Sequence, residues 1–224
     1  MMAKEWLLDN VDEFDSTTIY KLFTGLQQVV SGNRITSIKP LRSVPLFQNP
    51  ADNPRIKALL GIIPDGKVII WCKFKHEIED IKTVLSKVYG QEQIAVFYGG
   101  LNLKKRIEQI EKFRNSAKFL IANKVCGGYG LNLQFCNNMI YYSNDFNFAT
   151  RAQSEDRVHR IGQEKDVWIY DICAYSKIDV RILKNLWKKE NLTDSFKHHL
   201  TLSRDTISDW IDGRDTYDTD RFGT

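Results

Sequence analysis

Several classes of protein are excluded by what this chain of 224 residues has little of. It has no run of about 20 apolar residues, the length that a membrane-spanning helix needs, and its start lacks the pattern of a signal peptide. Its four cysteines are widely spaced in apolar runs and form no metal-binding pair. We therefore expect no bound metal and buried free thiols in a reducing cytoplasm, at Cys72, Cys126, Cys136 and Cys173.

The chain also lacks a strong net charge, internal repeats and low-complexity tracts. Its formal charge is +4, and 42% of its residues are apolar and 27% charged, as in an ordinary globular protein. Its length suits one substantial core with appendages. The mildly basic balance permits an anionic partner without requiring one.

Short apolar runs alternate with helical patterns from residue 67 onward. The runs are continuous, as in strands of a parallel sheet that is covered on both faces. They predict strands at 67–72, 93–98, 118–122, 138–143 and 167–173. The segments between them predict helices at 74–88, 102–115 and 150–161, the second with Leu103, Ile107, Ile110 and Phe113 on one stripe. Together they predict a doubly wound α/β domain with a mainly parallel sheet and helices on both faces.

The segments on either side of this alternating region have different sequence patterns. Residues 16–31 predict an amphipathic helix, followed by an irregular proline-containing stretch from Pro40 to Pro54 and a helix at 55–63. A basic helix is expected at 181–189, and the polar segment 201–224 could hold a short helix at 207–211. We therefore divide the chain into an N-terminal connection at 1–55, a core domain at 56–190 and a polar tail at 191–224.

The segment 127–163 carries most of the chemistry. Gly127, Gly128 and Gly130 follow a predicted strand, where glycines bring backbone amides close to a phosphate or ribose, or simply form a turn. Further on, Gln153, Arg157 and Arg160 have the spacing of one helix face. Guanidiniums suit a developing phosphoryl transition state. The alternative is a solvated face with ion pairs to Glu155 or Asp156.

These residues carry a family resemblance. QSEDRVHRIGQ at 153–163, preceded by GGYGLNL at 127–133, resembles the motif that closes the helicase core of Swi/Snf-family ATPases. KVIIWCKFKHEIEDI from Lys67, YGGLNLKKR at 98–106, YSKIDVRI at 175–182 and LFTGLQQVVSG near the start resemble further landmarks of that family in the same order. The resemblance spans residues 16–189.

The resemblance implies a motor with two RecA-like lobes that hold ATP and Mg²⁺ between them. The first lobe would supply the phosphate-binding loop and the acidic pair for Mg²⁺, and this chain the arginine fingers Arg157 and Arg160, with Gln153 coupling the nucleotide to the cleft. By residue match, the nucleotide contacts would be Gly128, Gly130, Asn132 and Asp156.

Some positions depart from the family pattern. Ser143 stands where many members have Asp, Phe146 and Phe148 replace a usual Trp and Pro, and NKVC at 123–126 is an uncommon approach to the glycines. These variants are closer to bacterial and phage branches than to chromatin remodellers, which implies a bacterial or phage-infected host cytoplasm.

Two segments imitate the missing first lobe. GIIPDGK at 61–67 matches the phosphate-loop pattern, but Val68 replaces its Ser or Thr, and the segment precedes a strand instead of following one. Asp12 and Glu13 imitate an acidic pair, yet no buried strand leads into them. We therefore expect no ATP hydrolysis from this chain alone.

Basic and small residues at the ends of the predicted strands are the candidates for DNA contact. A shared track would bind the backbone of double-stranded DNA without sequence preference, although each residue could equally be solvated surface. The candidates are Lys73, Lys75, Gly99, Gly100, Lys104, Lys105, Arg106, Asn123 and Lys124.

The sequence thus predicts the C-terminal lobe of an ATP-dependent DNA translocase or helicase-like motor. The alternative is an orphan module that binds nucleic acid or a protein partner without catalysis. The spacing of Gln153, Arg157 and Arg160 favours the motor, because a binding module has no need for it. A small-molecule enzyme is disfavoured, since none of the usual catalytic constellations stands out.

Overall fold

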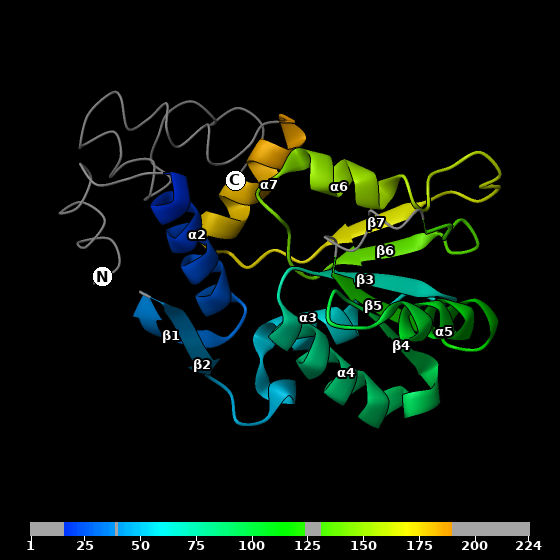
Figure 1. Ribbon diagram of the computed structural model, residues 1–224, viewed down its shortest axis with the longest axis horizontal. Coiled ribbons are helices and arrows are strands. Elements are labelled where there is room, and N and C mark those ends of the chain that lie inside the picture. Colours follow the sequence, from blue (N-terminus) through cyan, green and yellow to red (C-terminus); the bar gives the residue numbers. More distant parts are fainter. Residues whose placement is uncertain (1–15, 39, 124–130, 190–224) are drawn as a thin grey trace.

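A five-stranded parallel sheet organises the computed structural model, which describes residues 16–38, 40–123 and 131–189 (Figure 1). The strand order is β4-β5-β3-β6-β7, and every neighbouring pair is parallel. The strands are β3 (Val68–Cys72), β4 (Ile94–Phe97), β5 (Phe119–Asn123), β6 (Asn138–Tyr141) and β7 (Trp168–Asp171). This topology confirms the predicted doubly wound α/β class.

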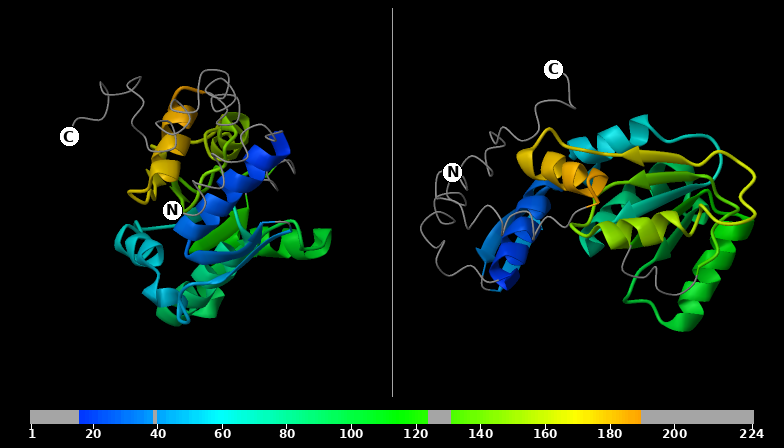
Figure 2. Two further views of the ribbon diagram at one scale, coloured as in Figure 1. Left: turned by 90° about the vertical axis from the view of Figure 1, so that its left-hand side faces the viewer. Right: turned by 90° about the horizontal axis from the view of Figure 1, so that it is seen from above.

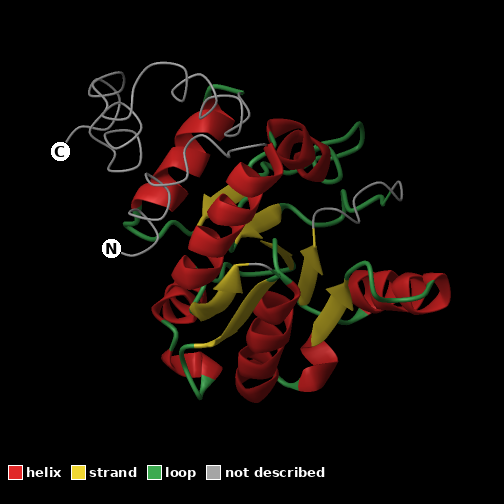
Figure 3. Ribbon diagram, turned by 60° about the vertical axis from the view of Figure 1, so that its left-hand side comes forward, coloured by secondary structure: helices red, strands yellow, loops and turns green. Residues whose placement is uncertain are grey.

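The central strand β3 separates two apolar clusters, and all five of its side chains are buried. Its register aligns Val68 with Phe119 of β5 and with Asn138 of β6. The helices α3 (Pro54–Gly61) and α4 (Lys75–Tyr89) cover one face. The helix α5 (Leu103–Asn115) and the segment 131–136 cover the other, so helices lie on both sides of the sheet (Figure 3).

The N-terminal part of the described chain is more regular than predicted. The helix α2 (Ser16–Val30) confirms the amphipathic pattern. The stretch after it, expected to be irregular, forms the antiparallel hairpin β1 (Asn33–Ile38) and β2 (Leu41–Pro45), followed by a 3₁₀ turn, η2 (Pro50–Asp52). The hairpin can accommodate its prolines, because Pro40 lies in the turn and Pro45 is the last residue of a strand.

The helix α7 (Lys177–Trp187) begins four residues before the expected 181 and packs beside α2 (Figures 1 and 2). It buries Ile178, Ile182 and Leu186. The prediction missed its first turn, whose acidic residue Asp179 is also buried through a polar contact described below.

Two expectations about burial are wrong at and after strand β7. Strand β7 lies at the edge of the sheet, so Trp168 and Ile169 are exposed instead of covered on both faces. The following Cys173 is exposed, whereas Cys72 and Cys136 are buried as expected. Cys126 lies outside the described residues.

The apolar stripe predicted for α5 is buried only at its end. Ile110 and Phe113 pack on the sheet, but Leu103 and Ile107 are 64% and 57% exposed. They border a shallow groove of about 250 Å³. The helix therefore extends past the apolar surface that the sheet offers it.

None of the described helices is long and apolar enough to cross a membrane. The described residues also contain no cluster of three His, Cys, Asp or Glu side chains suited to a metal ion.

Candidate functional site

A hollow of about 780 Å³ lies where the chain leaves the helix α6 (Phe148–Glu155). Five of the predicted site residues meet in it, namely Asn132, Gln153, Asp156, Arg157 and Arg160. Gln134, His159 and Ile161 complete the lining. Sequence reasoning missed Gln134, although its place directly after the GGYGLNL motif and two residues after Asn132 offered a signal.

The two arginines do not lie on a helix, because α6 ends at Glu155 and not near 161 as predicted. Tertiary hydrogen bonds draw the chain out of the helix. The carbonyl of Arg157 accepts from the amide of Leu133 at 3.0 Å. Gln163 donates to the carbonyls of Gln134 and Cys136 at 2.9 and 3.1 Å. The segment 156–163 is thereby fastened to the segment that precedes β6.

Gly162 lets this fastened segment turn. Its φ of +99° lies in the region that favours glycine, and an added Cβ would come within 3.3 Å of the Gln134 side chain. A tight turn at this point returns the chain towards β7 and leaves the preceding Ile161 fully exposed at the rim of the hollow.

Among the described residues, neither Arg157 nor Arg160 pairs with a carboxylate. The ion pairs with Glu155 or Asp156 that the alternative required are absent, because Glu155 instead pairs with Arg151 at 2.7 Å. The Nε atom of Arg157 is buried without a hydrogen-bond partner in the described part of the chain. Such an atom carries a desolvation cost until a ligand or partner supplies an acceptor.

The hollow lies near the start of β6, at the amino ends of the parallel strands and not at their carboxyl ends. Arg151, in α6, bonds to Asn144, which follows β6. Six residues later, Arg157 bonds to Leu133, which precedes β6. The helix therefore runs antiparallel to the strand, as Figure 1 shows.

The candidates for DNA contact gather at the other end of the sheet, where β3, β4 and β5 finish. Gly99 and Gly100 are exposed there, and Lys75 is exposed at the start of α4. Lys104 and Lys105 are exposed in the first turn of α5, which Asn102 caps. Two of the candidates bond to backbone carbonyls of the protein itself: Arg106 donates to the carbonyl of Gly99, and Asn123 donates to that of Lys73.

Lys73 does not lie open to solvent as a phosphate contact requires. Its ammonium lies 3.2 Å from the centre of the Phe146 ring and within 5.6 Å of the ring centres of Tyr20 and Phe74. It donates to the amide oxygen of Gln27 in α2 at 2.7 Å. Burial lowers the pKa of Lys73 to about 8, against the opposing effect of Asp145 and Glu77.

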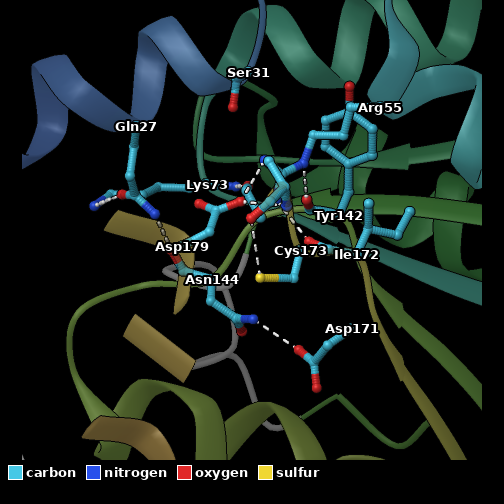
Figure 4. A network of polar contacts seen from close by, with 12 residues as sticks. Gln27, Ser31, Arg55, Lys73, Tyr142, Asn144, Asp171, Ile172, Cys173 and Asp179 are labelled. Carbon is cyan, nitrogen blue, oxygen red and sulfur yellow. Dashed lines mark hydrogen bonds and ion pairs between the residues drawn. The ribbon is translucent and has the colours of Figure 1, made fainter. Parts of the chain in front are cut away.

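Buried polar contacts join these strand ends to the helices around them (Figure 4). The carboxylate of Glu77 accepts from the hydroxyls of Ser31 and Ser143 and from two backbone amides at the start of α4. Gln27 donates to the carbonyl of Asn144 at 2.9 Å. No periodic pattern in the sequence indicates the bonds of Glu77 to the two serines or of Gln27 to Asn144, because each of these joins residues at least 46 positions apart.

The guanidinium of Arg55 makes several of these buried contacts. It bonds to Asp179 at 2.8 Å and to the carbonyls of Tyr142 and Ile172 at 2.7 and 2.6 Å. Burial alone would lower the pKa of Arg55, but the neighbouring Asp179 and other groups raise it overall. The charged guanidinium thus ties α3 to α7 and to the ends of β6 and β7.

The segment that imitates a phosphate loop has a structural role. Lys67 donates to the carbonyls of Phe113 and Ala117 at the end of α5, at 2.6 and 2.8 Å. The segment also leads into β3 instead of following a strand. Asp12, Glu13, Lys124, Gly127, Gly128 and Gly130 lie outside the described residues.

Comparison with known proteins agrees with this architecture. Residues 54–162 match the model of the helicase conserved C-terminal domain. The chain is 41% identical over 128 residues to the ATP-dependent helicase YqhH of Bacillus subtilis, an alignment that covers 57% of this chain and 22% of YqhH. It is 28% identical over 205 residues to Helicase SWR1 of Candida glabrata, covering 80% of this chain and 14% of SWR1.

A solved structure shares the fold. The Sulfolobus solfataricus SWI2/SNF2 ATPase core in complex with dsDNA superposes with a TM-score of 0.68 at 21% identity, covering 94% of this chain and 46% of that one. The chain spans less than a quarter of the length of the two curated relatives named above. The sequence match over residues 54–162 and the shared fold together show that this chain is similar to the C-terminal RecA-like lobes of helicases, those of SWI2/SNF2 ATPases among them.

Proposed function

We propose that this chain is the C-terminal lobe of an ATP-dependent DNA translocase or helicase-like motor, in which Arg157 and Arg160 reach a nucleotide held by a first RecA-like lobe. The observation that carries the proposal is the hollow at the end of α6, in which both guanidiniums lie without a carboxylate partner among the described residues.

The lining suits the phosphates of ATP with Mg²⁺. ATP supplies the phosphoryl group whose transfer to water drives the motor. Arg157 and Arg160 offer permanent charge and a fixed fork of donors, which stabilise negative charge as it develops on that group. The side-chain amides of Gln153 and Asn132 can bond to neighbouring oxygens. Asp156 lies on the same wall and is suited to a ribose hydroxyl.

Double-stranded DNA is the proposed partner at the opposite end of the sheet. The exposed cations Lys75, Lys104 and Lys105 lie in the first turns of α4 and α5, and the exposed Gly99 and Gly100, which follow β4, allow a phosphate backbone to approach closely. Lys73 is left out of this track, because its ammonium lies among three aromatic rings. The named residues are lysines and glycines, which suit contacts to the phosphate backbone, so the proposed binding is independent of sequence.

A bacterial or phage branch is the proposed origin. Among the similar curated proteins are bacterial ones, such as the helicase of Bacillus subtilis that is 41% identical over 128 residues. This agrees with the departures from the family pattern at Ser143, Phe146 and Phe148.

The decisive experiment measures DNA-stimulated ATPase activity of this chain alone and combined with a first lobe from the same source. We expect no activity alone, activity on combination, and loss of about 10³-fold or more for Arg157→Ala or Arg160→Ala. Arg34→Ala, an exposed arginine in the hairpin, is the matched control and should keep full activity. If every mixture is silent while DNA or protein binding persists, the chain is a binding module instead.

A further inference from the structure

Polar contacts, and not apolar packing, hold α6 on the sheet. The helix has eight residues and buries only the side chains of Arg151 and Ser154. The hydroxyl of Ser154 lies 2.7 Å from that of Tyr141 in β6. A helix of this length is not stable by itself, so its direction depends on the contacts that it makes.

Arg151 makes most of those contacts. Its guanidinium donates to both carboxylate oxygens of Asp171 at 2.5 and 3.0 Å, to Asn144 at 3.0 Å and to Glu155 at 2.7 Å. It also lies 3.9 Å from the centre of the Tyr141 ring. One side chain thus joins α6 to the ends of β6 and β7.

The acceptors around Arg151 are themselves fixed. Asn144 donates to Asp171 at 2.7 Å, as Figure 4 shows, and its carbonyl accepts from Gln27. Burial alone would lower the pKa of Arg151, but bonding to Asp171 raises it overall, so the guanidinium stays charged. A planar fork can satisfy this set of acceptors, whereas a lysine ammonium cannot reproduce its geometry.

The helix leads directly to the hollow. Gln153 is two residues beyond Arg151, and Arg157 is two residues beyond the last residue of α6. The far end is fastened by the bond between Leu133 and Arg157. Arg151 fixes the middle of α6, and the bond to Leu133 fixes the chain just beyond its end, so the direction of α6 determines where the two guanidiniums of the hollow project.

We propose that Arg151 is a positioning residue for Arg157 and Arg160, and that it acts by setting the direction of α6 without touching the nucleotide. This inference rests on the proposed function. It distinguishes Arg151 from a residue that only stabilises the fold, because loosening α6 should displace the fingers while the rest of the domain stays intact.

The test compares Arg151→Lys with Arg55→Lys in the complete motor, formed from this chain and its first lobe. The two arginines are matched: each is buried, each is paired with an aspartate, and each bonds to several acceptors. The Arg55 side chain, however, bonds to Tyr142, Ile172 and Asp179, and none of these residues lies in α6. For Arg151→Lys we expect kcat to fall by roughly 10- to 100-fold with little change in the KM for ATP, as misplaced catalytic groups cause.

Arg55→Lys should keep kcat within about twofold, whatever it does to the melting temperature. Asp171→Asn keeps the shape of the acceptor but removes its charge, and it should also lower kcat. It tests the inference independently if Arg151→Lys fails to fold. Equal kcat per folded molecule for Arg151→Lys, Asp171→Asn and the unmodified chain would overturn the inference.

Arg160→Ala in the same assay separates the two proposals. If Arg160→Ala abolishes turnover while Arg151→Lys leaves it unchanged, only the role of Arg151 is wrong. If Arg160→Ala also leaves turnover unchanged, the proposed function itself fails, and the inference fails with it.

Discussion

Two pairs of arginines in this lobe differ in what surrounds their charge. Arg55 and Arg151 are buried, and each bonds to an aspartate and to further acceptors. Arg157 and Arg160 line an open hollow and have no carboxylate partner in the described part of the chain. The first pair fastens strands to helices, whereas the second pair remains available to an anion from outside.

The difference shows how structural and functional charges can be separated in a single fold. A buried charge is tolerated where its acceptors belong to the fold itself. A guanidinium without an ion pair, such as that of Arg157 with its buried and unbonded Nε, adds nothing to stability and persists where another molecule supplies the acceptor. The comparison therefore assigns stability to Arg55, the positioning of α6 to Arg151, and direct contact with the nucleotide to Arg157 and Arg160.

The largest expected effect concerns the open pair. In the isolated chain, Arg157→Ala or Arg160→Ala should change the free energy of unfolding by no more than about 0.5 kcal/mol, since neither removes an ion pair. In the complete motor the same variants should lower kcat by about 10³-fold or more. Urea denaturation and ATPase assays measure the two quantities. A large loss of stability would show that these arginines hold the fold and would remove the contrast.

The next effect concerns the buried pair. Asp179→Ala leaves Arg55 charged and unpaired in the interior, which should lower the free energy of unfolding by about 3–5 kcal/mol. Urea denaturation of the isolated chain checks this, with the exposed Arg34→Ala as the control that should be neutral. A loss below about 1 kcal/mol would mean that the Arg55 network relaxes or takes up water.

The sequence predicted the interior of the sheet well and its periphery poorly. Strand β3 could be predicted because a continuous apolar run has one stable place, the centre of a covered sheet. The run at β7 looked similar, yet it lies at an edge where Trp168 is exposed. Hydrophobicity alone does not show strand order, which depends on how distant segments pair.

The candidate site was predicted by motif and not by local structure. Five of its residues meet in one hollow, but the helix that was expected to present them ends at Glu155. Long-range bonds from Leu133 and Gln163 decide that ending, and no local pattern reveals them. The same holds for Arg151, whose partner Asp171 lies 20 residues away.

An intermediate effect depends on pH. Because burial lowers the pKa of Lys73 to about 8, its charge costs stability below that pH, and the cost is relieved as pH rises towards the ordinary value of 10.5. Lys73→Met removes the titration. From about pH 7.5 to about pH 9.5, the unmodified chain should therefore gain on the order of 2 kcal/mol relative to Lys73→Met. Lys75→Met, at an exposed site, is the control, and parallel profiles for Lys73→Met and the unmodified chain would contradict the enclosure of Lys73.

The smallest effect compares the same two lysines in DNA binding. Each phosphate contact contributes about −0.9 to the slope of log K against log salt concentration, because binding releases counterions. Lys75→Ala should reduce the magnitude of that slope by about one contact, whereas Lys73→Met should leave it unchanged, since the Lys73 ammonium faces Gln27 and aromatic rings. Titrations of each variant with double-stranded DNA at several salt concentrations measure this slope. A reduced slope for Lys73→Met would mean that DNA draws Lys73 out of its aromatic surroundings, and that α2 moves when the lobe binds.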